Sequence, residues 1–206
     1  MLYGACFGIE LTVNSFAALY FIDKFHISLG LAGLLAGLHG MMNLFARKMG
    51  GNMSDRLAIR FSIQARVLFL FSVILLEGIT LFLFGMMNDL TSVIIMLLVF
   101  SLFVQLAAGA TYSIVPFLKN KRMGIVSGIV GAGGNLGAIA AAFLFGSENM
   151  SFQTGFQILG LVVTGMSGLT LFIRFSPYVR AKEKWTLQKI LATPVFASQT
   201  PHRELD

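Results

Sequence analysis

Long apolar segments are the feature that most limits what this chain can fold into. Six such segments follow one another, separated by polar stretches, and each is long enough to cross a bilayer. A helix of about 20 apolar residues spans the ~30 Å hydrocarbon core. The sequence therefore predicts an all-α, polytopic membrane protein with six transmembrane helices, at about residues 2–22, 29–51, 67–87, 90–118, 122–145 and 152–175.

Composition excludes a soluble globular domain. Of the 206 residues, 56% are hydrophobic and only 12% are charged, whereas soluble domains carry about 25% charged residues. The single cysteine, Cys6, excludes an internal disulfide framework, and the three histidines show no metal-ligand spacing. No metal site and no cofactor are predicted. The net charge of +6 lies in polar stretches between apolar segments, which indicates membrane orientation and not nucleic acid binding.

The positions of lysine and arginine predict how the chain is oriented. They gather after the second segment, after the fourth segment and in the polar tail, whereas the other connections carry only Lys24. Because cytoplasmic loops carry an excess of these residues, both termini of this chain are expected in the cytoplasm. The tail at residues 178–206 is polar with mixed charge and is expected to be largely disordered.

Arg47 is the most informative single residue, because it falls near the end of the second apolar segment. A guanidinium in a membrane segment costs several kcal/mol unless it pairs or faces water. Two interpretations stay open. The side chain can reach the interface by snorkelling, or its planar fork of donors can bind a planar oxyanion.

Two carboxyl groups also lie inside predicted membrane helices, Glu10 and Glu77. A buried carboxyl can titrate and carry a proton, or it can be a paired or neutral structural group. Both interpretations stay open for Glu10. The sequence contains no Gly-x-Ser-x-Gly stretch and no P-loop lysine, so the chain is not expected to be an enzyme.

A glycine-dense run at residues 124–138 holds a single amide, Asn135. Small residues let helix backbones approach closely in a membrane. The run therefore predicts a helix–helix packing seam. The alternative is a seam that also lines a substrate path.

Several ordered stretches resemble the nitrate/nitrite porter family of the major facilitator superfamily, in its plant and algal type. Residues 3–14 and 20–26 resemble the seventh helix of that family, and residues 45–55 its eighth helix and the following loop. Residues 99–109 resemble the tenth helix, and residues 131–137 the nitrate signature of the eleventh. Lys48 departs from the family pattern, which often has proline there. The resemblance covers about residues 3–177.

The resemblance implies the C-terminal half of a plasma-membrane transporter in which two six-helix halves hold nitrate or nitrite between them. Transport would proceed by alternating access and proton symport, with Glu10 as the candidate for proton coupling. The residues implied in substrate binding are Arg47, Tyr3, Phe7, Asn135, Gly133 and Gly134. Gly131 and Gly137 are implied in helix packing, and Gly51, Asp55 and Arg56 in a cytoplasmic loop motif within a basic loop at residues 52–66.

The partners implied are nitrate or nitrite, protons, the lipid bilayer, a missing N-terminal half and, for some members, a small single-span accessory protein. The chain is expected to be a fragment or truncation, or a half that assembles with another chain. Two alternatives remain: a transporter of another small anion on the same fold, and a non-transporting membrane subunit.

Overall fold

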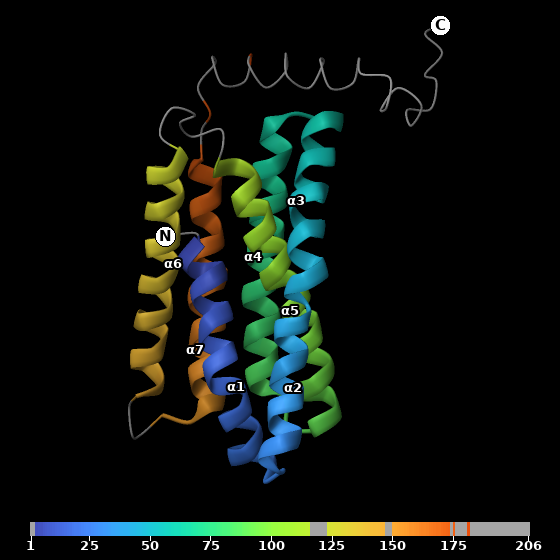
Figure 1. Ribbon diagram of the computed structural model, residues 1–206, viewed down its shortest axis with the longest axis vertical. Coiled ribbons are helices and arrows are strands. Elements are labelled where there is room, and N and C mark those ends of the chain that lie inside the picture. Colours follow the sequence, from blue (N-terminus) through green and yellow to red (C-terminus); the bar gives the residue numbers. More distant parts are fainter. Residues whose placement is uncertain (1–2, 116–122, 147–149, 174, 176–180, 182–206) are drawn as a thin grey trace, which may run out of the picture.

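A computed structural model describes residues 3–115, 123–146, 150–173, 175 and 181 (Figure 1). The described residues form helices and no strands, and helices run along the long axis of a single bundle. The elements in chain order are η1 (Gly4–Gly8), α1 (Ile9–Phe25), α2 (Leu29–Met41), α3 (Asn43–Arg60), α4 (Ile63–Met86), α5 (Leu90–Ile114), α6 (Met123–Phe145), α7 (Phe152–Ser167) and η4 (Gly168–Phe172).

The all-α prediction is confirmed. Among the described residues, six helical stretches are long and apolar enough to cross a membrane: Gly4–Phe25, Leu29–Arg60, Ile63–Met86, Leu90–Ile114, Ser127–Phe145 and Phe152–Phe172. The loop at residues 116–122 and the tail at residues 178–206, apart from residue 181, lie outside the described residues. The chain is a multi-pass membrane protein.

The second membrane stretch is longer than the sequence predicts. It runs on through a bend at Met42 to Arg60, so residues 52–60 are helical and the predicted basic loop is wrong there. Ser54 and Ala58 face the bundle, where Ser113 Oγ donates to Ser54 Oγ at 2.7 Å. The charged residues between them stay at the surface, so the helix continues as an amphipathic one. Gly51, Asp55 and Arg56 therefore lie in helix α3 and not in a loop.

α4 and α5 form the centre of the bundle. α4 packs against α7 and α5, and α3 packs against α5. Where α1, α4 and α7 meet, the core is aromatic, with Tyr20, Phe84 and Phe156 fully buried in mutual ring contact. α6 lies at one edge, where it packs against η1 (Figure 1). This arrangement places the N-terminal turns of the chain between α6 and the α3–α5 pair.

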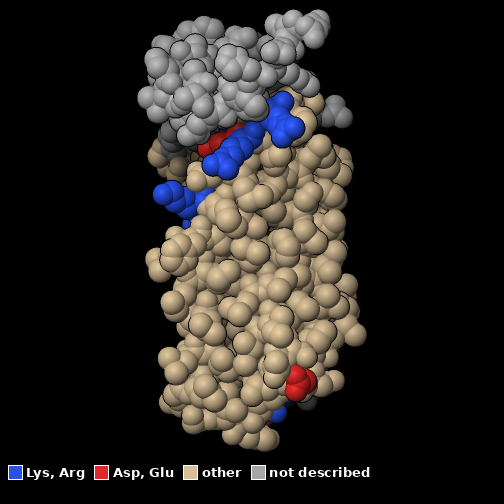
Figure 2. Space-filling view, turned by 90° about the vertical axis from the view of Figure 1, so that its right-hand side faces the viewer, with Lys and Arg blue, Asp and Glu red and all other residues tan. Residues whose placement is uncertain are grey.

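Charged side chains are concentrated at the end of the bundle where α3 meets α4. Figure 2 shows Lys and Arg gathered there, above an uncharged middle region. Arg66 of α4 is buried at this end and forms an ion pair with Asp55 of α3. The pair fastens the two helices together where they leave the apolar region.

Candidate functional site

Arg47 points into the bundle from α3, where two side chains hold its guanidinium. Nη2 forms an ion pair with Oε2 of Glu10 on α1. Nε donates a hydrogen bond to Oε1 of Gln105 on α5, at 3.2 Å. The Arg47 side chain keeps 28% of its surface exposed, whereas the Glu10 side chain keeps 5%. Arg47 is therefore paired on its buried side and open on the other, so it does not simply snorkel.

Glu10 is fixed from a second direction. Asn43, one turn before Arg47 on the same helix, donates from Nδ2 to Glu10 Oε1 at 3.1 Å. Both carboxylate oxygens thus accept a hydrogen bond, each from α3. Charge-assisted hydrogen bonds of this kind are the stronger ones in proteins. The Asn43–Glu10–Arg47–Gln105 set is one connected polar network within the membrane stretches.

An aromatic wall adjoins this network. The rings of Tyr3 and Phe7 stack at 5.2 Å with an interplanar angle of 8°. The Arg47 guanidinium lies 6.0 Å from the Phe7 ring centroid, within cation–π range. Tyr112 of α5 meets Tyr3 edge-on at 5.0 Å. The structure therefore brings Tyr3, Phe7, Glu10 and Arg47 to one place.

Glycines of α6 pack directly against this wall. A Cβ added at Gly134 would lie 2.7 Å from Phe7 Cδ1 and 3.0 Å from Tyr3 Cδ1. A Cβ at Gly137 would lie 2.6 Å from the Gly4 carbonyl oxygen, and one at Gly4 would lie 2.9 Å from the Gly133 oxygen. Real Cβ atoms do not come so close, so only glycine fits this seam. The seam is formed by the π-helical turn η1 and the glycine-rich run of α6.

Arg47 itself is placed by a close crossing of α3 and α5. A Cβ at Gly109 would lie 2.0 Å from the Arg47 carbonyl oxygen, and a Cβ at Gly50 would lie 2.3 Å from the Leu106 oxygen. Backbone contact at these two glycines brings Gln105 within hydrogen-bond distance of Arg47.

Other predicted residues lie apart from the network. Asn135 is exposed on α6, and its Nδ2 donates to the Gly131 carbonyl oxygen at 3.2 Å, one turn back on the same helix. A Cβ added at Gly131 would meet no described atom within 4 Å beyond the neighbouring backbone of its own helix. Asp55 pairs with Arg66, and Gly51 lies near Gly109 on the α3–α5 contact.

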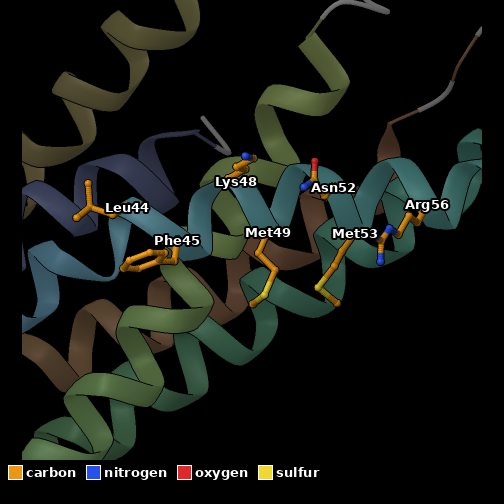
Figure 3. Close-up of a pocket in the computed structure, with 7 residues that line it drawn as sticks. All are labelled: Leu44, Phe45, Lys48, Met49, Asn52, Met53 and Arg56. Atoms are coloured by element: carbon orange, nitrogen blue, oxygen red, sulfur yellow. The ribbon is translucent and has the colours of Figure 1, made fainter. Parts of the chain in front are cut away.

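A separate pocket lies along α3 (Figure 3). Lys48 and Arg56 are its cationic residues, and Phe45, Met49 and Met53 form its apolar lining. Arg56 is the one predicted functional residue in it. The pocket does not include the Arg47–Glu10 pair.

Sequence reasoning did not assign Asn43, Gln105 or Gly109 to the site. Asn43 had a visible signal, because His39, Asn43 and Arg47 recur at intervals of four on one helix face. Gln105 is a lone amide in an apolar segment, which marks it as functional or paired. Gly109 had no local signal, because its role depends on which helix crosses it.

The chemistry of the network suits a small planar anion. An arginine has five N–H donors, and hydrogen bonds within the described residues use Nη2 and Nε of Arg47. The Arg47 side chain keeps 28% of its surface exposed, and its Cζ lies 6.0 Å from the centroid of the Phe7 ring. Neither a cluster of three metal-ligating residues nor a second arginine beside Arg47 occurs in the described part of the chain.

Three relatives indicate which proteins the chain resembles. It is 40% identical over 161 residues to high affinity nitrate transporter 2.5 of Arabidopsis thaliana, which covers 78% of this chain and 32% of the relative. It is 39% identical over 180 residues to nitrate transporter 2.1 of Chlamydomonas reinhardtii, with 84% and 33% covered. It is 30% identical over 185 residues to elsinochrome transporter 1 of Elsinoe fawcettii, with 86% and 36% covered.

The chain spans about a third of the length of these relatives. All three are named as transporters, which agrees with the expectation that the chain is not an enzyme. No protein-family model matches the chain, and no solved structure matches it either.

Proposed function

Because the chain belongs to the nitrate transporter family of the major facilitator superfamily, we propose that it is the C-terminal six-helix half of a transporter that carries nitrate, or nitrite, across a membrane. The residues that hold the anion are Arg47, Phe7 and Tyr3. The activity belongs to a larger assembly, in which a second six-helix half faces the open side of Arg47.

The observation that carries this proposal is the Arg47–Glu10 ion pair. Nitrate and carboxylate are both planar oxyanions of charge −1, and an arginine fork binds either through parallel N–H···O bonds. Glu10 therefore occupies part of the fork as an internal anion. The exposed part of the guanidinium beside Phe7 is left for the transported anion.

Proton coupling follows from the same geometry. While Glu10 is ionised, it holds Nη2 of Arg47. A proton on Glu10 removes its negative charge and frees the fork, so the anion and the proton favour the same state. Each ligand thereby raises the affinity for the other, as linkage requires.

Alternating access places the site between two halves that rock against each other. We assign the plasma membrane as the location, with the basic end of the bundle, where Asp55 pairs with Arg66, in the cytoplasm. Gly133, Gly134 and Gly137 hold α6 against the aromatic wall while the half moves as a unit. A small single-span accessory protein is a further partner of this assembly.

A chimera tests the substrate role of Arg47. This chain replaces the matching third of the Chlamydomonas nitrate transporter 2.1, and nitrate uptake is measured in cells that lack their own uptake. Arg47→Lys keeps the charge but removes the fork, so kcat/KM for nitrate should fall about 10- to 100-fold, the equivalent of one or two hydrogen bonds to a charged group.

Arg60→Lys is the matched control, because Arg60 is exposed at the far end of α3 and outside the network. It should leave uptake unchanged. Unimpaired uptake by the Arg47→Lys chimera, at equal surface expression, would remove Arg47 from the substrate site.

A second candidate is a transporter for another solute on the same fold, which the match to elsinochrome transporter 1 favours. The two candidates differ in the role of Arg47. If Arg47 binds nitrate, changing it lowers nitrate uptake selectively. Competition by nitrite, but not by a bulky aromatic solute, in the parent chimera would favour the small-anion site.

A further inference from the structure

Glu77 is a second carboxyl deep in the bundle, and the proposed site does not use it. It lies midway along α4, and its side chain is 0% exposed. Neither carboxyl oxygen has a hydrogen-bond partner of ordinary geometry among the described residues. Buried polar atoms almost always find partners, so a carboxyl without a hydrogen bond of ordinary geometry calls for a physical explanation.

The α4 backbone around Glu77 is held by tight packing and by a hydrogen bond. The next residue, Gly78, packs so tightly on α7 that an added Cβ would lie 2.4 Å from Thr164 Oγ1. The backbone carbonyl of Glu77 accepts a hydrogen bond from Thr80 at 3.1 Å. The α4 backbone is therefore fixed at this level, and the carboxyl stays inside.

Two titratable groups act on Glu77, both from the N-terminal helix. The Cys6 thiol of η1 lies against its carboxyl and also against Thr111 of α5. Glu10, the partner of Arg47, acts on it electrostatically. α7 and η4 pack against α4 and carry no titratable side chain. On α3, Asp55 pairs with Arg66 at the far end of the bundle. Tyr112 of α5 contacts Tyr3.

Neighbouring carboxyl groups share protons unequally. Glu10 has a cation and two hydrogen-bond donors, which stabilise its ionised form. Within the described part of the chain no lysine or arginine forms an ion pair with Glu77, and the Glu10 charge acts on it, so a second negative charge there would be costly. The surroundings therefore favour an ionised carboxylate at Glu10 and a neutral acid at Glu77. Different surroundings divide acid and base roles between two carboxyl groups in this way.

We propose that Glu77 is a second proton-holding carboxyl of the transporter, and that its protonation is linked to that of Glu10 across Cys6. The neutral acid at Glu77 and the ion pair at Glu10 form one unit that binds protons jointly. Any event that removes the charge of Glu10, such as its protonation, makes ionisation of Glu77 easier.

Infrared spectroscopy of the purified chain in detergent tests this linkage without any transport. A buried carboxylic acid gives a C=O stretching band that shifts in heavy water. The band should be absent in Glu77→Gln and present in Glu10→Gln. If Glu77→Gln does not fold by circular dichroism, Glu77→Asp keeps an acid in the same place and should displace the band.

The pH titration of this band tests the link between the two carboxyls. In Glu10→Gln the band should fade at a pH about 1 unit or more below that of the parent, the scale of strongly interacting sites. Asp23→Asn makes the same change of charge on α1 at its far end and should leave the titration unchanged. A band that neither Glu77 variant alters, or an identical titration in Glu10→Gln, overturns the proposal.

The transport readout rests on the proposed function and is kept separate. In the chimera, Glu77→Gln should shift the pH at which nitrate uptake is half-maximal, because Glu10 then titrates without its linked carboxyl, while KM for nitrate changes less than twofold. Unchanged pH dependence overturns the transport role of Glu77. A parent chimera without any nitrate uptake contradicts the proposed function, and the infrared result then decides the linkage alone.

Discussion

At the scale of single residues, the site depends on which groups balance the charge of Arg47. Its guanidinium has one buried carboxylate partner and one amide partner, and it keeps an open side. The sequence allowed Arg47 and Glu10 to be singled out separately, because ionisable residues within membrane segments are rare. Their pairing could not be read from it. The two residues are 37 positions apart, and helix rotation decides whether they meet.

Glu10→Gln tests the role of the internal carboxylate. The change removes the negative charge that competes for Arg47, so nitrate uptake by the chimera should continue at high external pH and lose most of its pH dependence. Uptake is compared at two external pH values at equal expression.

Asp23→Asn serves again as the control on α1, since Asp23 lies outside the network. A Glu10→Gln chimera with the parent's pH dependence would exclude Glu10 as the coupling group.

At the scale of elements, hydropathy marks where apolar residues stop and not where helices stop. The stretch from Leu29 to Arg60 has 32 residues and is about 48 Å long at 1.5 Å per residue. That length exceeds the ~30 Å hydrocarbon core. Hydropathy could not predict that α3 continues to Arg60, because the signal for its last turns is the burial of Ser54 and Ala58 against other helices.

The glycines of α6 differ in a way that the sequence could not reveal. Gly137→Ala would place a Cβ 2.6 Å from the Gly4 oxygen, whereas Gly131→Ala meets nothing within 4 Å. We expect Gly137→Ala to cost about 1–3 kcal/mol of stability by forcing η1 and α6 apart. Gly131→Ala should be neutral or stabilising by up to about 1 kcal/mol, since alanine favours helix.

Thermal unfolding of the purified chain in detergent measures both variants side by side. Equal melting temperatures for the two would contradict the seam as the structure describes it.

At the scale of the whole molecule, burial is uneven. The α5 stretch is 61% buried, whereas the stretch containing α2 and α3 is 22% buried and that of α6 is 11% buried. The sequence predicted six helices and the all-α class, because length and hydropathy suffice for that. It could not say which helices form the centre. That outcome depends on glycine contacts between segments, such as Gly78 with α7 and Gly109 with α3.

The two-half proposal makes a prediction for the isolated chain. Expressed alone, the chain should take up no nitrate, because no second half then faces the open side of Arg47. Co-expression with the remaining two thirds of the Chlamydomonas relative should restore uptake if the halves pair.

The control is co-expression with the Arg47→Lys chain, which should give little uptake at the same expression level. Robust nitrate uptake by the isolated chain would contradict the assignment as one half of a transporter.

The π-helical turn at Gly4–Gly8 determines the direction in which Tyr3, the residue before it, points from the helix axis. Its hydrogen bonds span five residues in place of four, so the turn contains one residue more than an α-helical turn. One residue corresponds to about 100° around a helix axis. If the turn tightened to α-helix, Tyr3 would swing by about that angle away from Tyr112, while Arg47 and Glu10 stayed in place. The position of Tyr3 and that of the charged network can thus be set independently, with a single inserted residue as the adjustment between them.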